Sequence, residues 1–212
     1  MRGVTSNTCV LCGCRAATTR DHLPPRSFFK GMDAHDLITV PACSECNHGA
    51  SSDDEDMRFF VSVQVGKQAP GAAHLWEQGA LKSVKRKTSL RKQVTSTVRE
   101  LQVNDSESRT STRLAIEVPA RAYESVFGRI TRGLYFFNAG KILPPNTNVQ
   151  VVPLASPPDE AILQPFERHQ IAGGAFVYWF GLAHDEPSSS LWLYQFYGIH
   201  WVQATTGSAS DA

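Results

Sequence analysis

The sequence predicts an α+β protein with a small metal-stapled module at its N-terminus and an antiparallel sheet in its C-terminal half. Three observations lead to this fold class. Two Cys-x-x-Cys pairs lie within the first 50 residues. Several later segments alternate apolar and polar residues, as half-buried strands do. One segment between them carries apolar residues at helical spacing, which is typical of an amphipathic helix.

The N-terminal module is predicted from its cysteines. Cys9 and Cys12 form one pair, and Cys43 and Cys46 form another about 30 residues further on. Four thiolates can hold one tetrahedral Zn²⁺, and such a site staples a chain that has too few apolar residues to fold unaided. Disulfides are disfavoured because no apolar signal segment follows the first residue and each pair is too close for an ordinary bridge. Cys14 is expected to lie beside the zinc without binding it.

The staple brings Asp21, His22 and Asn47 into one small fold, in which a short hairpin is expected to present His22 and a helix is expected to start near Cys43–Asn47. Carboxylate and amide oxygens suit Mg²⁺ or Mn²⁺ rather than zinc. Histidine can take a proton from water near neutral pH. Together these are the parts of a metal-assisted phosphodiester hydrolase, because a divalent metal offsets the negative charge of the phosphate while the imidazole activates water. The zinc is expected to take no part in catalysis, since four cysteines close its coordination sphere.

Three stretches of this region resemble the HNH endonucleases, in the branch with a zinc-bound ββα-metal (treble-clef) core. The stretches are Cys9-Val-Leu-Cys12, Arg20-Asp21-His22-Leu23-Pro24-Pro25-Arg26-Ser27 and Asp36-Leu37-Ile38-Thr39-Val40-Pro41-Ala42-Cys43-Ser44-Glu45-Cys46-Asn47. The resemblance covers roughly residues 5–60. Paired cysteines, an Asp-His step, a proline shortly after it and a Cys-Asn step follow one another in the family's order.

The resemblance implies a role for each matching residue. It makes His22 the general base, and Asp21 and Asn47 the protein ligands of one catalytic Mg²⁺ or Mn²⁺. The family's central Asn, which has a structural role in its loop, is replaced here by Asp36.

The resemblance leaves the third ligand of the catalytic metal open. Many members carry a Lys or His a few residues after the Cys-Asn step, whereas His48 follows at once in this chain. His48 and Asp53 are therefore both candidates for the third metal ligand or for the residue that contacts the phosphate.

Two functions from different classes follow from these residues. The first is a metal-dependent HNH endonuclease that hydrolyses phosphodiester bonds in DNA, with RNA open as an alternative substrate. The second is a zinc-bearing module that binds nucleic acid or protein and whose HNH site no longer cuts. Intact Asp21, His22 and Asn47 favour the first function. The variant position Asp36 and the missing downstream basic residue favour the second.

The segment after the cysteines is predicted to be helical and then strongly basic. The acidic run 53–56 is expected to form the first turn of a helix over residues 53–65, where it favours the positive end of the helix dipole. Pro70-Gly71 marks a break, and a short helix is expected over 72–81. Residues 82–92 are either a phosphate-tracking arm or a solvated linker. In the first interpretation the phosphate contacts are Lys85, Arg86, Lys87, Arg91 and Lys92.

The C-terminal half alternates strand and helix patterns. An amphipathic helix is expected over 121–137, and Asn138-Ala139-Gly140 ends it. The segments that read as strands are 98–103, 113–118, 148–154, 175–182, 191–197 and 199–204, with a short helix over 159–168. Aromatic residues crowd the last strands, and they indicate a sheet core or, alternatively, a platform for unstacked bases. These residues are Trp179, Trp192, Tyr194, Phe196, Tyr197 and Trp201.

These elements divide the chain into an HNH module with structural zinc (1–65), a basic connector (66–96) and a C-terminal α+β domain of unknown role (97–212). The 42% hydrophobic and 19% charged residues are ordinary for a globular protein. The net charge of +1 means that nucleic-acid binding must use a local patch. No apolar run is long enough to span a bilayer, and the implied reduced thiols predict the cytoplasm. Small HNH proteins often act in phage defence, mobile elements or restriction, so the resemblance implies one of these settings. The C-terminal domain is expected to hold DNA, to self-associate or to contact a defence partner.

Overall fold

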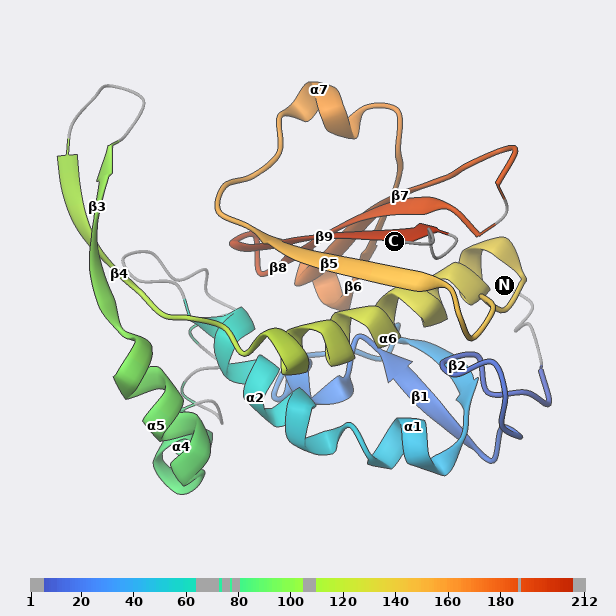
Figure 1. Cartoon of the computed structure of the whole chain (residues 1–212), viewed down its shortest axis with the longest axis horizontal. Coiled ribbons are helices and arrows are strands. Elements are labelled where there is room, and N and C mark those ends of the chain that lie inside the picture. The colour runs from blue at the N-terminus through green and yellow to red at the C-terminus, as the bar shows by residue number, and fades with distance from the viewer. Residues whose placement is uncertain are drawn as a thin grey trace.

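The computed structural model describes residues 6–63, 73, 77, 81–104, 110–186 and 188–207. In this part of the chain the fold is mixed α+β, as the sequence predicts. An antiparallel sheet, a long helix across one face of it, and the N-terminal elements beneath that helix form successive layers (Figure 1). The helix predicted over 72–81 lies mostly outside the described residues.

A β-hairpin carries the Asp-His step. Strands β1 (Thr19–Leu23) and β2 (Ile38–Ala42) pair antiparallel, with His22 opposite Thr39, and the 3₁₀ turn η1 (Arg26–Phe29) lies between them in the chain. Burial alternates along β1, as the pleat requires, so that Asp21 and Leu23 face the interior. The predicted hairpin that presents His22 is therefore confirmed.

Two consecutive helices follow the hairpin. Helix α1 (Ser44–His48) begins directly after Cys43, as predicted, and the Cys43 thiol caps it by accepting a hydrogen bond from the backbone N–H of Cys46 at 3.4 Å. Helix α2 (Ser51–Ser62) replaces the helix predicted over 53–65 and buries Met57, Phe59, Phe60 and Val61. The helix begins two residues earlier than predicted, so the acidic run spans its first two turns instead of forming only the first.

The described part of the predicted connector from residue 81 onward folds into helices, and the next two strands form a separate ribbon. Helices α4 (Leu81–Arg86) and α5 (Thr88–Thr97) follow one another, and α4 packs against α2. Strands β3 (Arg99–Asn104) and β4 (Thr110–Ala115) pair only with each other and project away from the main sheet (Figure 1). The strand pair is confirmed, but the predicted half-burial is wrong, because this ribbon joins no larger sheet and leaves Leu101 48% exposed.

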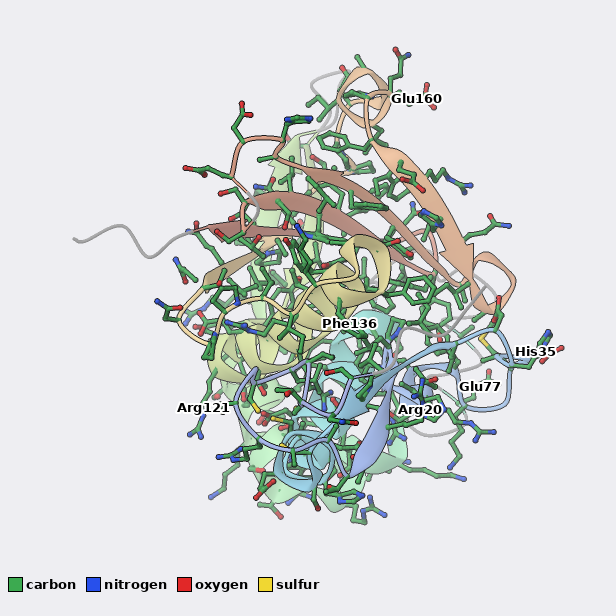
Figure 2. All side chains as sticks on the ribbon, turned by 90° about the vertical axis from the view of Figure 1, so that its right-hand side faces the viewer. Arg20, His35, Glu77, Arg121, Phe136 and Glu160 are labelled. Carbon is green, nitrogen blue, oxygen red and sulfur yellow. The ribbon has the colours of Figure 1, made fainter. Side chains whose placement is uncertain are left out.

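Helix α6 (Ala120–Ala139) matches the helix predicted over 121–137 and forms the middle layer. Its buried face includes the apolar positions that predict it, namely Tyr123, Val126, Phe127, Ile130 and Leu134. Phe136 extends this face between the sheet and the N-terminal elements (Figure 2). Gly140 ends the helix with a φ of 67°, a left-handed conformation that glycine adopts without strain.

The main sheet has the order β5-β9-β8-β7-β6, and every neighbouring pair is antiparallel. Its strands are β5 (Asn148–Leu154), β6 (Glu167–Ile171), β7 (Phe176–Leu182), β8 (Ser190–Phe196) and β9 (His200–Gly207). The helix predicted over 159–168 is only partly correct, since α7 (Glu160–Leu163) is short and β6 follows it. Cross-strand contacts explain the difference, because His169 stacks on Tyr178 and Arg168 lies over Trp179.

The crowded aromatic residues form the core of this sheet. Trp192, Tyr194 and Phe196 lie in the cluster that α6 covers, whereas Trp179 and Trp201 stack on each other in a second cluster. None of the six predicted aromatic residues is more than 8% exposed. The prediction of a sheet core is confirmed, and the alternative of a base-stacking platform is wrong for these rings because they are buried.

Contacts across a continuous hydrophobic cluster join the N-terminal elements to the sheet. Helix α6 approaches β1 so closely that a Cβ on Gly133 would lie 1.9 Å from Cδ1 of Leu23. Asp36 accepts a hydrogen bond from the backbone N–H of Ala172 at 2.9 Å, which ties the β1–β2 connection to the turn after β6. Among the described residues, no helix combines the length and apolarity that crossing a bilayer requires.

Candidate functional site

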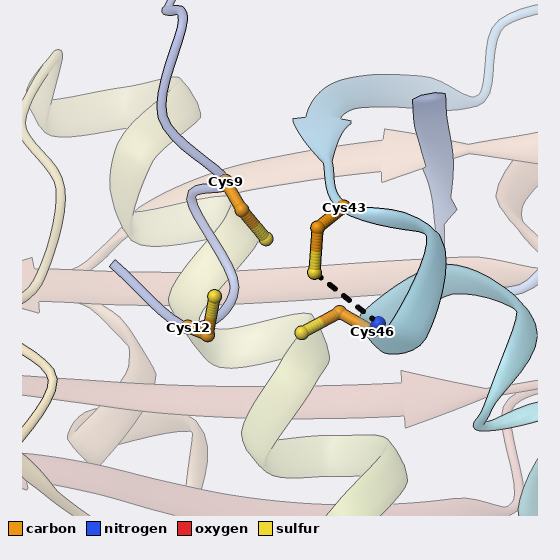
Figure 3. Close-up of side chains that lie close together, drawn as sticks. All are labelled: Cys9, Cys12, Cys43 and Cys46. Atoms are coloured by element: carbon orange, nitrogen blue, oxygen red, sulfur yellow. Dashed lines mark hydrogen bonds between the residues drawn. The ribbon is translucent and has the colours of Figure 1, made fainter. Parts of the chain in front are cut away.

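Four cysteine side chains meet at one point beside the hairpin. Cys9 and Cys12 come from the loop before β1, while Cys43 and Cys46 come from the end of β2 and from α1. Their sulfur atoms all lie within 4.8 Å of one another and point toward a common centre (Figure 3). Cys14 is exposed and stands outside this group, as predicted. In the described residues, no other group of three or more His, Cys, Asp or Glu side chains comes this close together.

The cysteine cluster could bind a metal such as zinc. Four thiolate ligands at mutual contact suit tetrahedral coordination and would close the coordination sphere of the ion. Burial and the neighbouring Cys43 thiol raise the pKa of the Cys46 thiol. A divalent cation at the centre would remove this obstacle to ionisation, because thiolates bind metals and thiols do not.

A cleft of about 620 Å³ opens beside the cysteine cluster and contains the three residues singled out from the sequence. Asp21 and His22 reach it from β1, and Asn47 reaches it from α1. The antiparallel hairpin and the helix that follows it bring Asp21 and Asn47 together across 26 positions of sequence. Asp21, His22 and Asn47 therefore line the same cleft.

Asp21 and Asp54 share a buried arginine. Asp21 on β1 is 6% exposed, and its Oδ2 lies 3.5 Å from Nη1 of Arg129 on α6. Nη2 of Arg129 donates a short hydrogen bond to Oδ1 of Asp54 on α2. Nη1 also donates a hydrogen bond to the backbone carbonyl of Cys46 at 3.4 Å. One guanidinium thus joins the hairpin, α1 and α2 to the long helix.

Burial dominates the acid–base behaviour of the two carboxyl groups. It raises the pKa of Asp54 to about 6, against the lowering effect of the Arg129 guanidinium, and the nearby Asp21 raises it further. Burial also raises the pKa of Asp21, and Arg129 again offsets part of the shift. Oδ2 of Asp21 has no hydrogen-bond partner in the structure although it is buried. A buried carboxylate oxygen of this kind is costly unless a cation completes its surroundings.

Asn47 and the two candidates for a third ligand differ in their surroundings. The side-chain N–H groups of Asn47 donate to Oγ1 of Thr19 at 3.1 Å and to the carbonyl of Arg20 at 3.0 Å. His48 lines the 620 Å³ cleft, but it is exposed and its Nδ1 lies 3.0 Å from Oγ of Ser44 in its own helix. Asp53 does not line the 620 Å³ cleft but lines a second one of about 600 Å³, on the side of α6.

Cations from three elements surround the candidate acids. The side chains that line the 620 Å³ cleft include Arg26, Lys30, Arg58, Lys82 and Arg86. Of the connector residues predicted to contact phosphates, only Arg86 lines this cleft. Arg86 and Lys87 instead pair with Glu55 and Asp56 of α2, each at 2.6 Å. Lys85, Arg91 and Lys92 are exposed.

Two further polar atoms of the cleft are buried without a hydrogen-bond partner. They are Oγ of Ser27 and Nε of Arg58. The hydroxyl of Ser27 can donate or accept a hydrogen bond, and Nε of Arg58 can only donate one. Sequence reasoning missed Arg58, Asp54 and Arg129 as site residues. Asp54 stood out only as part of an acidic run, and no local signal distinguishes Arg129 from other helix residues.

Comparisons with known proteins found no similar protein. No family model, curated protein or solved structure showed a significant match to the chain. The site is therefore interpreted from its own geometry.

Proposed function

We propose that this protein is a metal-dependent endonuclease of the HNH type, whose N-terminal hairpin, α1 and cysteine cluster form a zinc-bound ββα-metal core. The observation that carries the proposal is the convergence of Asp21, His22 and Asn47 on one cationic cleft beside the four sulfur atoms. In this proposal the zinc fixes the hairpin and α1 relative to each other, and the residues of the cleft carry out the phosphodiester hydrolysis.

The residues of the cleft fit a hard divalent cation such as Mg²⁺ or Mn²⁺. Asp21 lines the cleft and supplies a carboxylate that is almost fully buried. The amide nitrogen of Asn47 is engaged by β1, so its side-chain oxygen is the atom that remains for a metal. When bound, the cation would neutralise charge on the scissile phosphate and on the leaving oxygen.

His22 supplies the base in this proposal. It is half-buried at the cleft, next to the buried Asp21 in the strand. A neutral imidazole in this place can take the proton from a water that attacks the phosphorus, and the leaving oxygen departs on the opposite side. The hydrogen bonds of Asn47 to β1 hold the strand and helix at a constant separation during this step.

The cations of the cleft hold the substrate. Arg26, Lys30 and Arg58 reach it from η1 and α2, and Lys82 reaches it from α4. Because the net charge of the chain is only +1, such a local patch is what a polyanionic substrate requires. The proposed substrate is DNA, and RNA shares the phosphodiester chemistry.

A matched pair of charge variants tests where the phosphates lie. Replacing Lys30 and Lys82 by glutamine removes two cations from the cleft, and replacing Arg91 and Lys92 by glutamine removes two exposed cations from α5. The cleft variant should lower the slope of log K against log salt by about 0.9 for each lost contact. The α5 variant should keep the slope of the unmodified protein. Equal slopes in all three proteins would place the phosphates elsewhere, and a loss confined to the α5 variant would restore the connector interpretation.

The catalytic proposal is tested by nicking of supercoiled plasmid with and without added Mn²⁺. His22→Ala should lower the rate by about 10²–10⁴-fold and leave DNA binding unchanged, because the base acts only on water. His184→Ala is the control, since His184 is fully exposed between β7 and β8, where its Nδ1 lies 3.4 Å from Oδ1 of Asp185. If His22→Ala cuts as fast as the unmodified protein, His22 is not the general base and this cleft is not the site of cleavage.

A second candidate function is a zinc-bearing module that binds nucleic acid or protein without cutting it. The observation that favours it is the ion pair of Asp21 with Arg129, which already supplies one positive charge to the candidate metal ligand. If the unmodified zinc-loaded protein with saturating Mn²⁺ cuts neither DNA nor RNA yet binds either of them, this second function replaces the first.

A further inference from the structure

Arg129 brings the C-terminal part of the chain into the candidate site. It lies on α6, its side chain is 7% exposed, and its guanidinium contacts Asp21, Asp54 and the carbonyl of Cys46. In the sequence, Asp54 lies 75 positions and Asp21 lies 108 positions before Arg129. A buried arginine with two acidic partners is expensive to desolvate, so its place needs a reason beyond simple stability.

Arg129 contacts both carboxyl groups but does not line the cleft that they share. Asp21 and Asp54 both line the 620 Å³ cleft with His22 and Asn47, whereas Arg129 does not line it. Arg129 lines the second cleft instead, together with Asp53. The guanidinium therefore holds the two acids without occupying the place where a substrate would bind.

We propose that Asp54 is the third protein ligand of the catalytic divalent metal and that Arg129 is the positioning residue that holds Asp21 and Asp54 side by side. The inference rests on the proposed function, because it concerns the same cleft. It selects a ligand that neither the Cys-Asn step nor its neighbours indicate. It also explains how the C-terminal helix takes part in the site.

Three observations select Asp54 over the earlier candidates. Asp53 lines the second cleft and not the 620 Å³ cleft that Asp21 lines. His48 is exposed and its ring nitrogen contacts Ser44 within α1. Asp54 shares one guanidinium with Asp21, which places the two carboxyl groups next to each other.

The geometry of Arg129 explains why an arginine is needed for this task. Two carboxylates that face one cation repel each other when the cation is absent. The planar guanidinium spans both of them with separate nitrogens, Nη1 on Asp21 and Nη2 on Asp54. A lysine carries the same charge on one atom and cannot hold both acids in fixed positions. Outer-sphere partners of metal ligands commonly affect metal affinity by about 10–100-fold.

The test measures Mn²⁺ binding to the zinc-loaded full-length protein by calorimetry and by electron paramagnetic resonance. Asp54→Asn should weaken Mn²⁺ binding by at least about 10-fold, a loss comparable to that of Asp21→Asn. Asp53→Asn, one position away in the same helix, is the matched control and should bind Mn²⁺ as the unmodified protein does. Zinc content by elemental analysis should stay unchanged in all three variants, because the cysteine cluster is not altered.

Arg129→Lys tests the positioning role without a change of charge. It should weaken Mn²⁺ binding by about 10–100-fold while zinc content and the circular dichroism spectrum stay unchanged. Unweakened Mn²⁺ binding by this variant would overturn the role of Arg129. Should the variant fail to fold, Asp54→Asn still decides the ligand assignment.

The outcomes separate this inference from the proposed function. If Asp21→Asn loses Mn²⁺ and Asp54→Asn binds it normally, the inference fails and the endonuclease proposal stands. If the unmodified protein binds no Mn²⁺ and nicks no nucleic acid, both fail together. If Asp54→Asn and Asp21→Asn both lose Mn²⁺ and Asp53→Asn keeps it, the inference is supported.

Discussion

Replacing Gly133 by alanine should destabilise the protein, although alanine is the better helix former. In an exposed helix interior this change would stabilise by about 1 kcal/mol. At Gly133 the new methyl would lie 1.9 Å from Cδ1 and 3.2 Å from Cγ of Leu23, so β1 or α6 must shift. Leu23 is fully buried and has little room to rotate. Overpacking of this severity costs about 3 kcal/mol, so the net loss should be about 2 kcal/mol.

The sign of this effect should reverse when Leu23 is shortened. Leu23→Ala alone should cost about 2–5 kcal/mol, because it leaves a cavity at the contact of β1 with α6. In that background Gly133→Ala fills part of the cavity and regains the helix preference, so it should stabilise by about 1 kcal/mol. The resulting coupling free energy is about 3 kcal/mol, well above the non-additivity of distant sites.

Urea denaturation of the four proteins in this double-mutant cycle, followed by circular dichroism, measures the coupling. The fits should share one m-value, so that midpoints convert to free energies on a common scale. Gly128→Ala is a matched control on the same helix, since a Cβ there meets no atom within 4 Å. It should be neutral or stabilising. If Gly133→Ala stabilises the unmodified protein as much as it stabilises the Leu23→Ala variant, the close approach of α6 to β1 is not real.

Two further predictions concern the metal cluster and the core. Cys43→Ser should abolish binding of one zinc ion, as measured by elemental analysis, and should unfold the N-terminal module. Cys14→Ser should change neither the zinc content nor the fold. A folded protein without zinc would contradict this prediction. Burial lowers the pKa of His200 to about 4, so the unfolded chain binds a proton between about pH 6.5 and 4 that the fold excludes, and stability is lost as the pH falls through this window. The loss is at most about 3 kcal/mol, because the ring keeps some contact with solvent, and His200→Gln should abolish it in urea titrations at pH 7 and 4. An equal pH dependence in both proteins would refute the assignment to His200.

Local patterns in the sequence determined most of the secondary structure. The helical spacing of Tyr123, Phe127 and Leu134 predicted α6, because one apolar stripe must face the core. Alternation predicted four of the five strands of the main sheet, and glycine at position 140 marked a helix end. The spacing of the cysteines also predicted the cluster, since short loops and one hairpin suffice to bring them together.

Where local signals compete, the tertiary structure decided the outcome. Residues 167–171 carry no strong strand pattern, and they form β6 because His169 and Arg168 find aromatic partners on β7. The basic run after residue 81 reads as a linker by composition alone. It folds as α4 and α5 because acids of α2 pair with Arg86 and Lys87.

For the candidate site, too, some residues were indicated by the sequence and others only by the tertiary structure. The sequence by itself singled out Asp21, His22 and Asn47, because these residue types beside paired cysteines already suggest metal-assisted hydrolysis. Only the tertiary structure joined Asp54 and Arg129 to them, through ion pairs that close after α6 packs on the hairpin. The physical reason is range: spacing along the chain determines contacts within a hairpin or a helix, whereas a contact between distant elements depends on how their buried faces pack.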